Sequence, residues 1–178
     1  MRRPFAIAAL LLLAACSSHA DPKAGNASQA AVSKSALLPL VIRSAKGNHR
    51  FDVEAALSPK DQAQGLMFRK SLEADAGMLF PMEPPRTASF WMKDTLIPLD
   101  MLFIHTDGTI AFIKAQAEPY SREPVSAGVP VAAVLELRGG RAAELGIKEG
   151  DRVHWGHCAA PDAPIHETDA RLNFCPAS

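Results

Sequence analysis

Short apolar runs separated by turn-forming residues fill the chain beyond position 37, and this pattern limits the folds open to it. The first two runs, 37–43 and 50–57, flank Lys46-Gly47-Asn48, and in the second run apolar residues alternate with Asp52 and Glu54. Such alternation is typical of a strand with one face in solvent. We therefore predict an antiparallel hairpin over 37–57.

A second hairpin is predicted where the runs 100–105 and 109–115 flank Thr106-Asp107-Gly108. Asp-Gly between two apolar runs is the strongest short-range hairpin signal, because both residues tolerate the backbone geometry of a tight turn. Further strands are predicted at 77–80, 88–92, 131–137 and 152–155.

Prolines and polar residues predict the loops between these strands. Pro81, Pro84 and Pro85 follow the strand at 77–80, and proline cannot donate a hydrogen bond to a strand ladder. We expect a loop there, and a second, longer loop over the polar segment 118–130.

Helical signals are confined to two short segments. Ser58-Pro59-Lys60-Asp61 is typical of a helix start, since serine can accept from an exposed amide and proline suits the first helical position. That helix is expected to end at Gln64-Gly65, and a single helical turn is expected at 141–145 before Gly146. Many short strands with two short helical segments predict a mainly β fold, a small compact β-barrel or sandwich of antiparallel strands.

The composition fits one folded domain of ordinary kind. The chain has 178 residues, 48% of them apolar and 21% charged, which is enough apolar material for one packed core. Its 19 basic and 19 acidic side chains leave no basic excess. A nucleic acid is therefore not an expected partner.

Residues 1–15 have the pattern of a lipoprotein signal peptide. Arg2 and Arg3 precede an apolar run too short for a bilayer anchor, and small residues end it directly before Cys16. We predict cleavage before Cys16 and lipidation of that cysteine, which would make a membrane a partner through its acyl chains. The alternative is an ordinary secretory signal with an incidental cysteine.

Residues 16–36 contain mainly small and polar residues, so we expect a flexible tether between the lipid and the folded domain. Ser17 follows the cysteine where an inner-membrane retention signal would have Asp. We therefore predict a domain that faces the bacterial periplasm, anchored to the outer membrane.

Four blocks in order resemble the DUF192 family. They are Gly65-Leu66-Met67-Phe68-Arg69, Gly77-Met78-Leu79-Phe80, the stretch Phe90 to Asp100, and Val134 to Leu137 followed by Leu145 to Asp151. The resemblance covers about residues 37–155 and implies a compact, mostly β domain that is often exported and whose biochemical role is not settled. Residues 156–178 are a C-terminal extension beyond it.

Four charged residues stand among apolar neighbours: Arg69, Lys93, Asp100 and Glu136. Buried charges must be paired or used. They could form an internal ion-pair network, line a ligand pocket, or supply Asp100 and Glu136 as a catalytic acid and base.

A ligand pocket would be bordered by these residues together with Trp91 and Thr95. The neighbouring aromatic and methionine side chains could also line it, although such residues are ordinary core fillers. They are Phe68, Phe80, Phe90, Met67, Met78, Met92 and Met101.

The segment 146–151, Gly-Ile-Lys-Glu-Gly-Asp, resembles both a structural Gly-Asp turn and the end of a peptide-binding PDZ domain. Glycine relieves the steric cost of a tight turn and aspartate satisfies its amides, which favours the structural interpretation. A PDZ-like peptide-binding module stays a minor alternative.

In the C-terminal extension, Cys158 and Cys175 are the remaining cysteines once Cys16 carries lipid. An even pair in an oxidising compartment predicts a disulfide. The weaker alternative is a metal site built from these two cysteines and nearby imidazoles. Those imidazoles belong to His154, His157 and His166.

From these observations we expect a binding or envelope-accessory module for a small-molecule or envelope ligand, with no cofactor. The alternative is a hydrolase that acts on envelope polymers through Asp100 and Glu136. No phosphate loop, Gly-x-Ser-x-Gly or His-Glu-x-x-His motif favours an enzyme.

Overall fold

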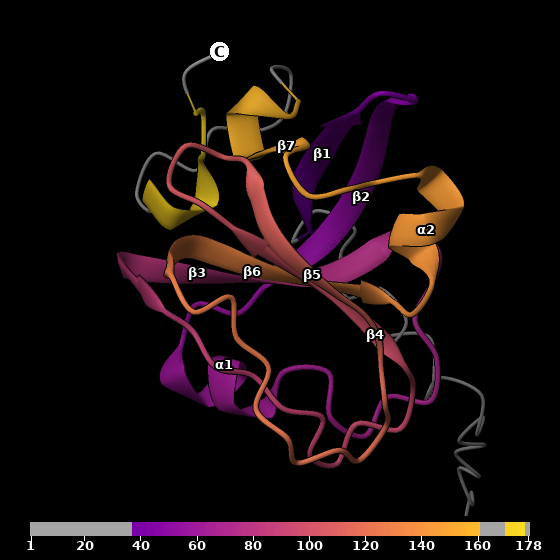
Figure 1. The fold of residues 1–178 in the computed structure, drawn as a ribbon. Coiled ribbons are helices and arrows are strands. Elements are labelled where there is room, and N and C mark those ends of the chain that lie inside the picture. Colours follow the sequence, from indigo (N-terminus) through magenta and orange to yellow (C-terminus); the bar gives the residue numbers. More distant parts are fainter. Residues whose placement is uncertain (1–36, 161–169, 177–178) are drawn as a thin grey trace, which may run out of the picture. The chain divides into compact units, whose positions relative to one another are not determined.

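The computed structural model describes residues 37–160 and 170–176, which form one mixed β-sheet with short helices (Figure 1). The strand order across the seven-stranded sheet is β5-β4-β6-β3-β2-β1-β7. The strands are β1 (Leu38–Ser44), β2 (Gly47–Ala55), β3 (Ala76–Thr87), β4 (Leu99–Ile104), β5 (Ile110–Ala117), β6 (Pro130–Arg138) and β7 (Arg152–Trp155). The helices are α1 (Pro59–Gln64) and α2 (Arg141–Leu145), with the 3-10 turns η2 (Gly156–Cys158) and η3 (Ala170–Leu172).

The predicted mainly β class is confirmed. Strand pairs are antiparallel except β2 and β3, which run parallel. The start of β5 meets the start of β7 through the isolated bridge between Thr109 and Arg152 and neighbouring backbone hydrogen bonds. Among the described strands the sheet is nevertheless not closed into a barrel.

Both predicted hairpins form, and the turn residues act as expected. β1 pairs with β2 around the turn at Gly47, and β4 pairs with β5 across 105–109. In the second turn, Asp107 Oδ1 accepts from the Thr109 amide at 2.9 Å, and Gly108 has a φ of 83° that favours glycine.

Both predicted helical segments are present. The Ser58 side chain accepts from the Asp61 amide at 3.1 Å, and Pro59 occupies the first helical position of α1. Gly65 ends α1 by donating its amide to the Asp61 carbonyl. Gly146 ends α2 in the left-handed conformation.

Two local predictions were wrong. The three prolines do not end β3, which continues to Thr87 because a register shift between Pro81 and Arg86 leaves positions where no ladder amide is needed. Residues 88–92 do not join the sheet. Phe90 forms an isolated bridge with Val125, so this segment pairs with the loop at 118–130 instead.

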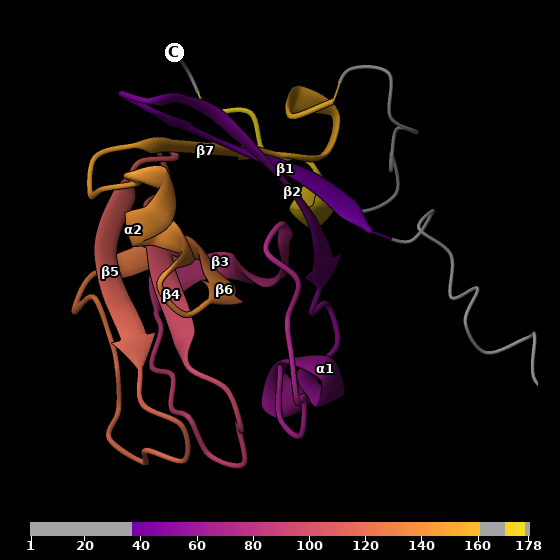
Figure 2. The same ribbon diagram turned by 90° about the vertical axis from the view of Figure 1, so that its right-hand side faces the viewer.

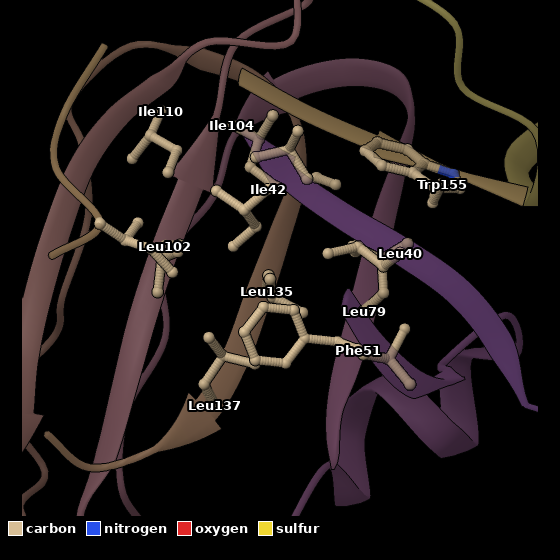
Figure 3. Packing of buried hydrophobic residues seen from close by; sticks show 14 of the residues in the cluster. Leu40, Ile42, Phe51, Leu79, Leu102, Ile104, Ile110, Leu135, Leu137 and Trp155 are labelled. Carbon is tan, nitrogen blue, oxygen red and sulfur yellow. The ribbon is translucent and has the colours of Figure 1, made fainter. Parts of the chain in front are cut away.

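One face of the sheet curls around the larger apolar core (Figure 3). Side chains from all seven strands meet there, among them Leu40, Ile42, Phe51, Leu79, Leu102, Ile110, Leu135 and Trp155. These side chains are nearly inaccessible to solvent, and burial on this scale is the main force that holds β1 and β7 against the rest of the sheet.

A second apolar cluster covers the opposite face of the central strands. It includes Met78 and Phe80 of β3, Met101 and Phe103 of β4, and Val134 of β6. Loop residues such as Leu66 and Met92 complete it. Helix α1 and the long loops lie on this side, at the end away from β7 (Figures 1 and 2).

Among the described residues, none of the helices has the length and apolar character needed to cross a membrane.

Candidate functional site

A pocket of about 310 Å³ opens on the second face of the sheet, between α1 and the segment 86–91. Helix α1 and the turn after it form one wall, and Phe90 and Trp91 contribute to the other. Phe80 of β3 and Glu136 of β6 also line it. The aromatic rings of Phe80 and Phe90 meet edge to face, with centroids 5.0 Å apart.

Glu136 is the most unusual group in this lining. It lies in the middle of β6 opposite Met101, so its side chain points to the same face as the second apolar cluster. Only 4% of the residue is exposed, and its carboxyl makes no hydrogen bond or ion pair with a residue that the structure describes. Burial raises the pKa of Glu136 to about 8, because the charged form loses its hydration.

The turn after α1 lies close above Glu136. A Cβ at Gly65 would lie 3.3 Å from the Phe80 ring and 4.0 Å from Glu136 Oε2. Gly65 also has a φ of 50°, which side-chain-bearing residues rarely adopt. The glycine of the Gly-Leu-Met-Phe-Arg block therefore lets the chain pass next to the carboxyl and form the pocket wall.

Trp91 and Thr95 line the same pocket. Trp91 is half exposed, and the ammonium of Lys93 lies over its ring, 5.7 Å from the centroid. Thr95 is buried and its hydroxyl donates to the Lys93 carbonyl at 3.2 Å. Lys93 itself is not in the lining. Its nearest acidic partner is Asp94, 4.0 Å from Nζ to Oδ2.

Asp100 has a different, structural environment. It pairs with Leu137 across β4 and β6, so it points to the face opposite that of Glu136. Its carboxylate is fully buried and accepts three backbone amides, those of Gln116, Gly140 and Ala142, at 2.8, 2.9 and 2.8 Å. Asp100 thereby holds the ends of β5 and β6 and the start of α2 together.

Arg69 lies outside the lining of the pocket and pairs with Glu54. Its two terminal nitrogens donate to the two carboxylate oxygens of Glu54, at 2.5 and 2.7 Å. Both residues line a smaller pocket beside the first one.

The structure therefore brings together Trp91, Thr95 and Glu136, with Lys93 beside them, and places Arg69 and Asp100 elsewhere. Asp100 and Glu136 do not form the acid–base pair considered from the sequence. Neither do these two carboxylates neutralise Arg69 or Lys93 in an internal network, because among the described residues each of these cations has another partner.

Five polar residues of the lining were not predicted from the sequence, namely Gln62, Gln64, Arg86, Thr87 and Ser89. Gln62 donates from Nε2 to the carbonyls of Ala56 and Pro81, at 3.1 and 3.2 Å. Arg86 is exposed at the far end of β3. Arg86 was not predicted because the prolines before it indicated a loop rather than a continuing strand. Gln62 was not predicted because nothing in the sequence distinguishes it from the other polar residues of a short helix.

The aromatic and methionine residues divide between core and surface. Phe80, Met78, Met92 and Met101 are buried as core residues. Phe68 is exposed and has a φ of 65°, with its amide bonded to the Asp94 carbonyl at 2.9 Å.

The segment 146–151 forms a local turn. Gly146 caps α2, and Asp151 Oδ2 accepts from the Lys148 amide at 2.8 Å. Both residues act as the structural interpretation of the sequence predicts.

Cys158 and Cys175 form the predicted disulfide. Beside it, the rings of Trp155 and Phe174 are stacked with centroids 4.1 Å apart, which fastens the described end of the extension to β7. The two sulfurs are bonded to each other and are not thiolate ligands here. Among the described residues no group of three or more His, Cys, Asp or Glu side chains could hold a metal. His166 lies outside the described residues, as do Cys16 and the predicted leader.

Comparison with known proteins gave one family and solved relatives. Residues 41–155 match the model of the DUF192 family, described as "Uncharacterized ACR". A crystal structure of a protein of unknown function from Novosphingobium aromaticivorans is 45% identical, with 67% of this chain and 85% of that chain covered and a TM-score of 0.66. A protein of Sinorhizobium meliloti 1021, described as a "putative transcription regulator", is 42% identical, with 67% and 94% covered and a TM-score of 0.65. No curated protein matches.

Proposed function

The chain belongs to the DUF192 family, and we propose that this member is a binding module whose small-molecule ligand occupies the pocket beside Glu136. The observation that carries the proposal is the carboxyl of Glu136. It is buried in an apolar wall of an open pocket and has no partner among the described residues.

A buried carboxyl without a partner is costly, since a residue such as leucine would pack the same face without that cost. In folded proteins such groups are concentrated at functional sites. The aromatic side chains around it add apolar contact area, and a few polar groups beside apolar walls are typical of ligand sites.

Binding is favoured over catalysis by what surrounds the carboxyl. The other buried carboxylate, Asp100, points to the opposite face, so a two-carboxylate hydrolase has no pair to use in this pocket. Of the described residues that line it, none is a histidine or a cysteine that could act as a nucleophile or a proton shuttle.

The description of the Sinorhizobium relative suggests a second function, transcription regulation. The equal numbers of basic and acidic side chains in this chain do not favour direct contact with nucleic acid. We therefore propose ligand binding rather than DNA binding.

We further propose that the module is held on a membrane and faces the periplasm, through lipidation of Cys16 and the tether at 16–36. This rests on the sequence of the leader. Metabolic labelling with an alkyne-tagged fatty acid should mark the wild-type protein and not the Cys16→Ser variant. Equal labelling of both would contradict it.

The test of the binding proposal is a small-molecule screen by thermal shift, repeated with a blocked pocket. Ala63 is an exposed residue of α1 that lines the pocket, so Ala63→Trp should fill its mouth without disturbing the core. Ala143→Trp on α2 is the matched control, because Ala143 is exposed and outside the lining. Ligands that stabilise wild type and Ala143→Trp but not Ala63→Trp support the proposal. Ligands unaffected by Ala63→Trp would overturn it.

A further inference from the structure

We propose that the ligand of this pocket carries a protonated amine, which the carboxylate of Glu136 binds as an ion pair. The inference rests on the proposed binding function and names the chemical class of the ligand. Three features of the described lining lead to it: an unpartnered acid, two less exposed polar side chains whose donors are already used, and aromatic walls.

The unpartnered acid is the first feature. No described cation pairs with it, since Arg69 binds Glu54 and Lys93 lies over Trp91 beside Asp94. Arg86 also lines the pocket, but it is exposed and makes no ion pair with Glu136. A cationic ligand would supply the missing partner, and a charged hydrogen bond to a buried carboxylate is stronger than one at the surface.

The second feature is that the two least exposed of the uncharged polar side chains in the lining, Gln62 and Thr95, already use their donors, whereas Gln64, Thr87 and Ser89 are exposed. The amide nitrogen of Gln62 donates to two backbone carbonyls, and the Thr95 hydroxyl donates to the Lys93 carbonyl. What these groups still offer is acceptor oxygens, namely Gln62 Oε1 and the Thr95 hydroxyl oxygen. Acceptors match a ligand rich in N–H donors, as an ammonium group is.

The third feature is the aromatic wall. Phe80, Phe90 and Trp91 line the pocket, and Trp91 already carries the Lys93 ammonium over its ring. Aromatic faces attract cations and exert no such pull on anions. The wall therefore favours the same ligand charge as the acid does.

The charged groups around the pocket set the pH at which this binding should operate. Arg86 of β3 is the other charged residue in the described lining, and it is exposed at the rim. Lys60 and Asp61 of α1 and Lys93 and Asp94 of the following loop lie outside the lining. β4 presents Met101 opposite Glu136, and Asp100 points away. Glu136 is thus the titratable group that an amine would meet.

Free Glu136 holds its proton at neutral pH, because its pKa is raised to about 8. An ammonium ligand must then displace that proton to solvent, while the ligand keeps its own. Binding at pH 7 should release close to one proton per complex, and the affinity should rise as the pH is raised from 6 to 8. A neutral ligand that accepts a hydrogen bond from the protonated acid would show the reverse trend.

The experiment uses three probes of one shape and different charge: benzylamine, benzyl alcohol and benzoate. Isothermal titration calorimetry of the full-length mature protein in two buffers of different ionisation heat gives both the affinity and the protons released. We expect benzylamine to bind at least about tenfold more tightly than benzyl alcohol, with proton release, and benzoate not to bind. Ala63→Trp should abolish the binding and Ala143→Trp should not.

Glu136→Gln should remove the preference for the amine and the proton release, and its folding is checked by a thermal melt. The pH dependence of wild-type binding tests the same point without a variant. Stronger binding of the alcohol or of benzoate, blocked by Ala63→Trp, would overturn the amine inference and leave the proposed binding function standing. The inference would also be overturned if benzylamine did not bind, or if it bound the Ala63→Trp variant as tightly as wild type. The proposed binding function itself is tested by the thermal-shift screen.

Discussion

Asp100 and Glu136 lie on neighbouring paired strands, and their side chains project from opposite faces of the sheet. Asp100 belongs to the side of the larger core, where it binds three backbone amides. Glu136 belongs to the other side, where it faces a pocket and binds no residue that the structure describes. Two acids with the same sequence signal therefore have different tasks, one in folding and one at the proposed site.

Replacing Asp100 should destabilise the domain without affecting the pocket. Asp100→Asn keeps the shape but turns one acceptor into a donor that faces backbone amides. We expect a loss of about 2–4 kcal/mol in the free energy of unfolding, measured by urea denaturation. Asp107→Asn, at an exposed turn, is the control and should cost under about 1 kcal/mol. Equal losses for the two variants would contradict the assigned role of Asp100.

The sequence identifies an acid inside an apolar strand but does not say to which face it points. The alternation of side chains along a strand tells which neighbours in the same strand share a face with Asp100 or with Glu136. Whether Asp100 and Glu136 share a face depends on the register between β4 and β6. That register is set by packing over distant parts of the chain. The hairpins and α1 could be predicted because their signals, such as Ser58 and Asp107, act within three residues.

The stability of the domain should fall as the pH rises through the range set by Glu136. Its pKa is raised from 4.5 to about 8, so the folded state binds a proton that the unfolded state has lost. The contribution of Glu136 to the free energy of unfolding is fully present below pH 4.5 and is lost progressively up to about pH 8. Over that range the free energy of unfolding should fall by up to about 1.4 kcal/mol per pH unit.

Urea denaturation from pH 5 to pH 8 measures this, with Glu136→Gln as the comparison. The variant should lack the part of the slope that comes from Glu136, and the difference between the two proteins isolates that part. His154, whose pKa is lowered by burial and by Arg43 and Arg152, has the opposite dependence, but it is common to both proteins and cancels. Parallel curves for wild type and variant would contradict the assignment.

Gly77 should not tolerate alanine. A Cβ at this position of β3 would lie 2.6 Å from the carbonyl oxygen of Glu136 and 2.9 Å from a Leu137 methyl group. Backbone cannot move aside as a side-chain end can, so Gly77→Ala should cost about 1–3 kcal/mol by thermal or urea unfolding. Wild-type stability of this variant would mean that β3 and β6 are further apart than described.

Removing the disulfide should destabilise the fold by about 3 kcal/mol, because a bridge that closes a loop of this size restricts the unfolded chain. The variant Cys158→Ala/Cys175→Ala should melt at a lower temperature than the oxidised protein. Thiol titration of the denatured, unreduced mature protein should find no free thiol from these cysteines. Two free thiols would contradict the bridge.

The prolines of β3 and the segment 88–92 were predicted wrongly for a common reason. Local propensity treats Pro81, Pro84 and Pro85 as a break and 88–92 as a strand. In the fold, the register shift in β3 accommodates the prolines, and Phe90 pairs with Val125 from a distant loop. Because the pocket forms where β3 is extended and 88–91 leaves the sheet, its outline could not be predicted from local sequence.

The most direct test of a pocket built around an unpartnered acid is the titration of Glu136 itself. Carbon-13 NMR of carboxyl-labelled glutamate, with the signal assigned by its absence in Glu136→Gln, follows this group alone. We expect a pKa near 8 in the free protein, lowered when benzylamine is added. A pKa near the ordinary 4.5, unchanged by the amine, would mean that the carboxyl is hydrated or already paired, and that Glu136 is not an unpartnered acid at a binding site.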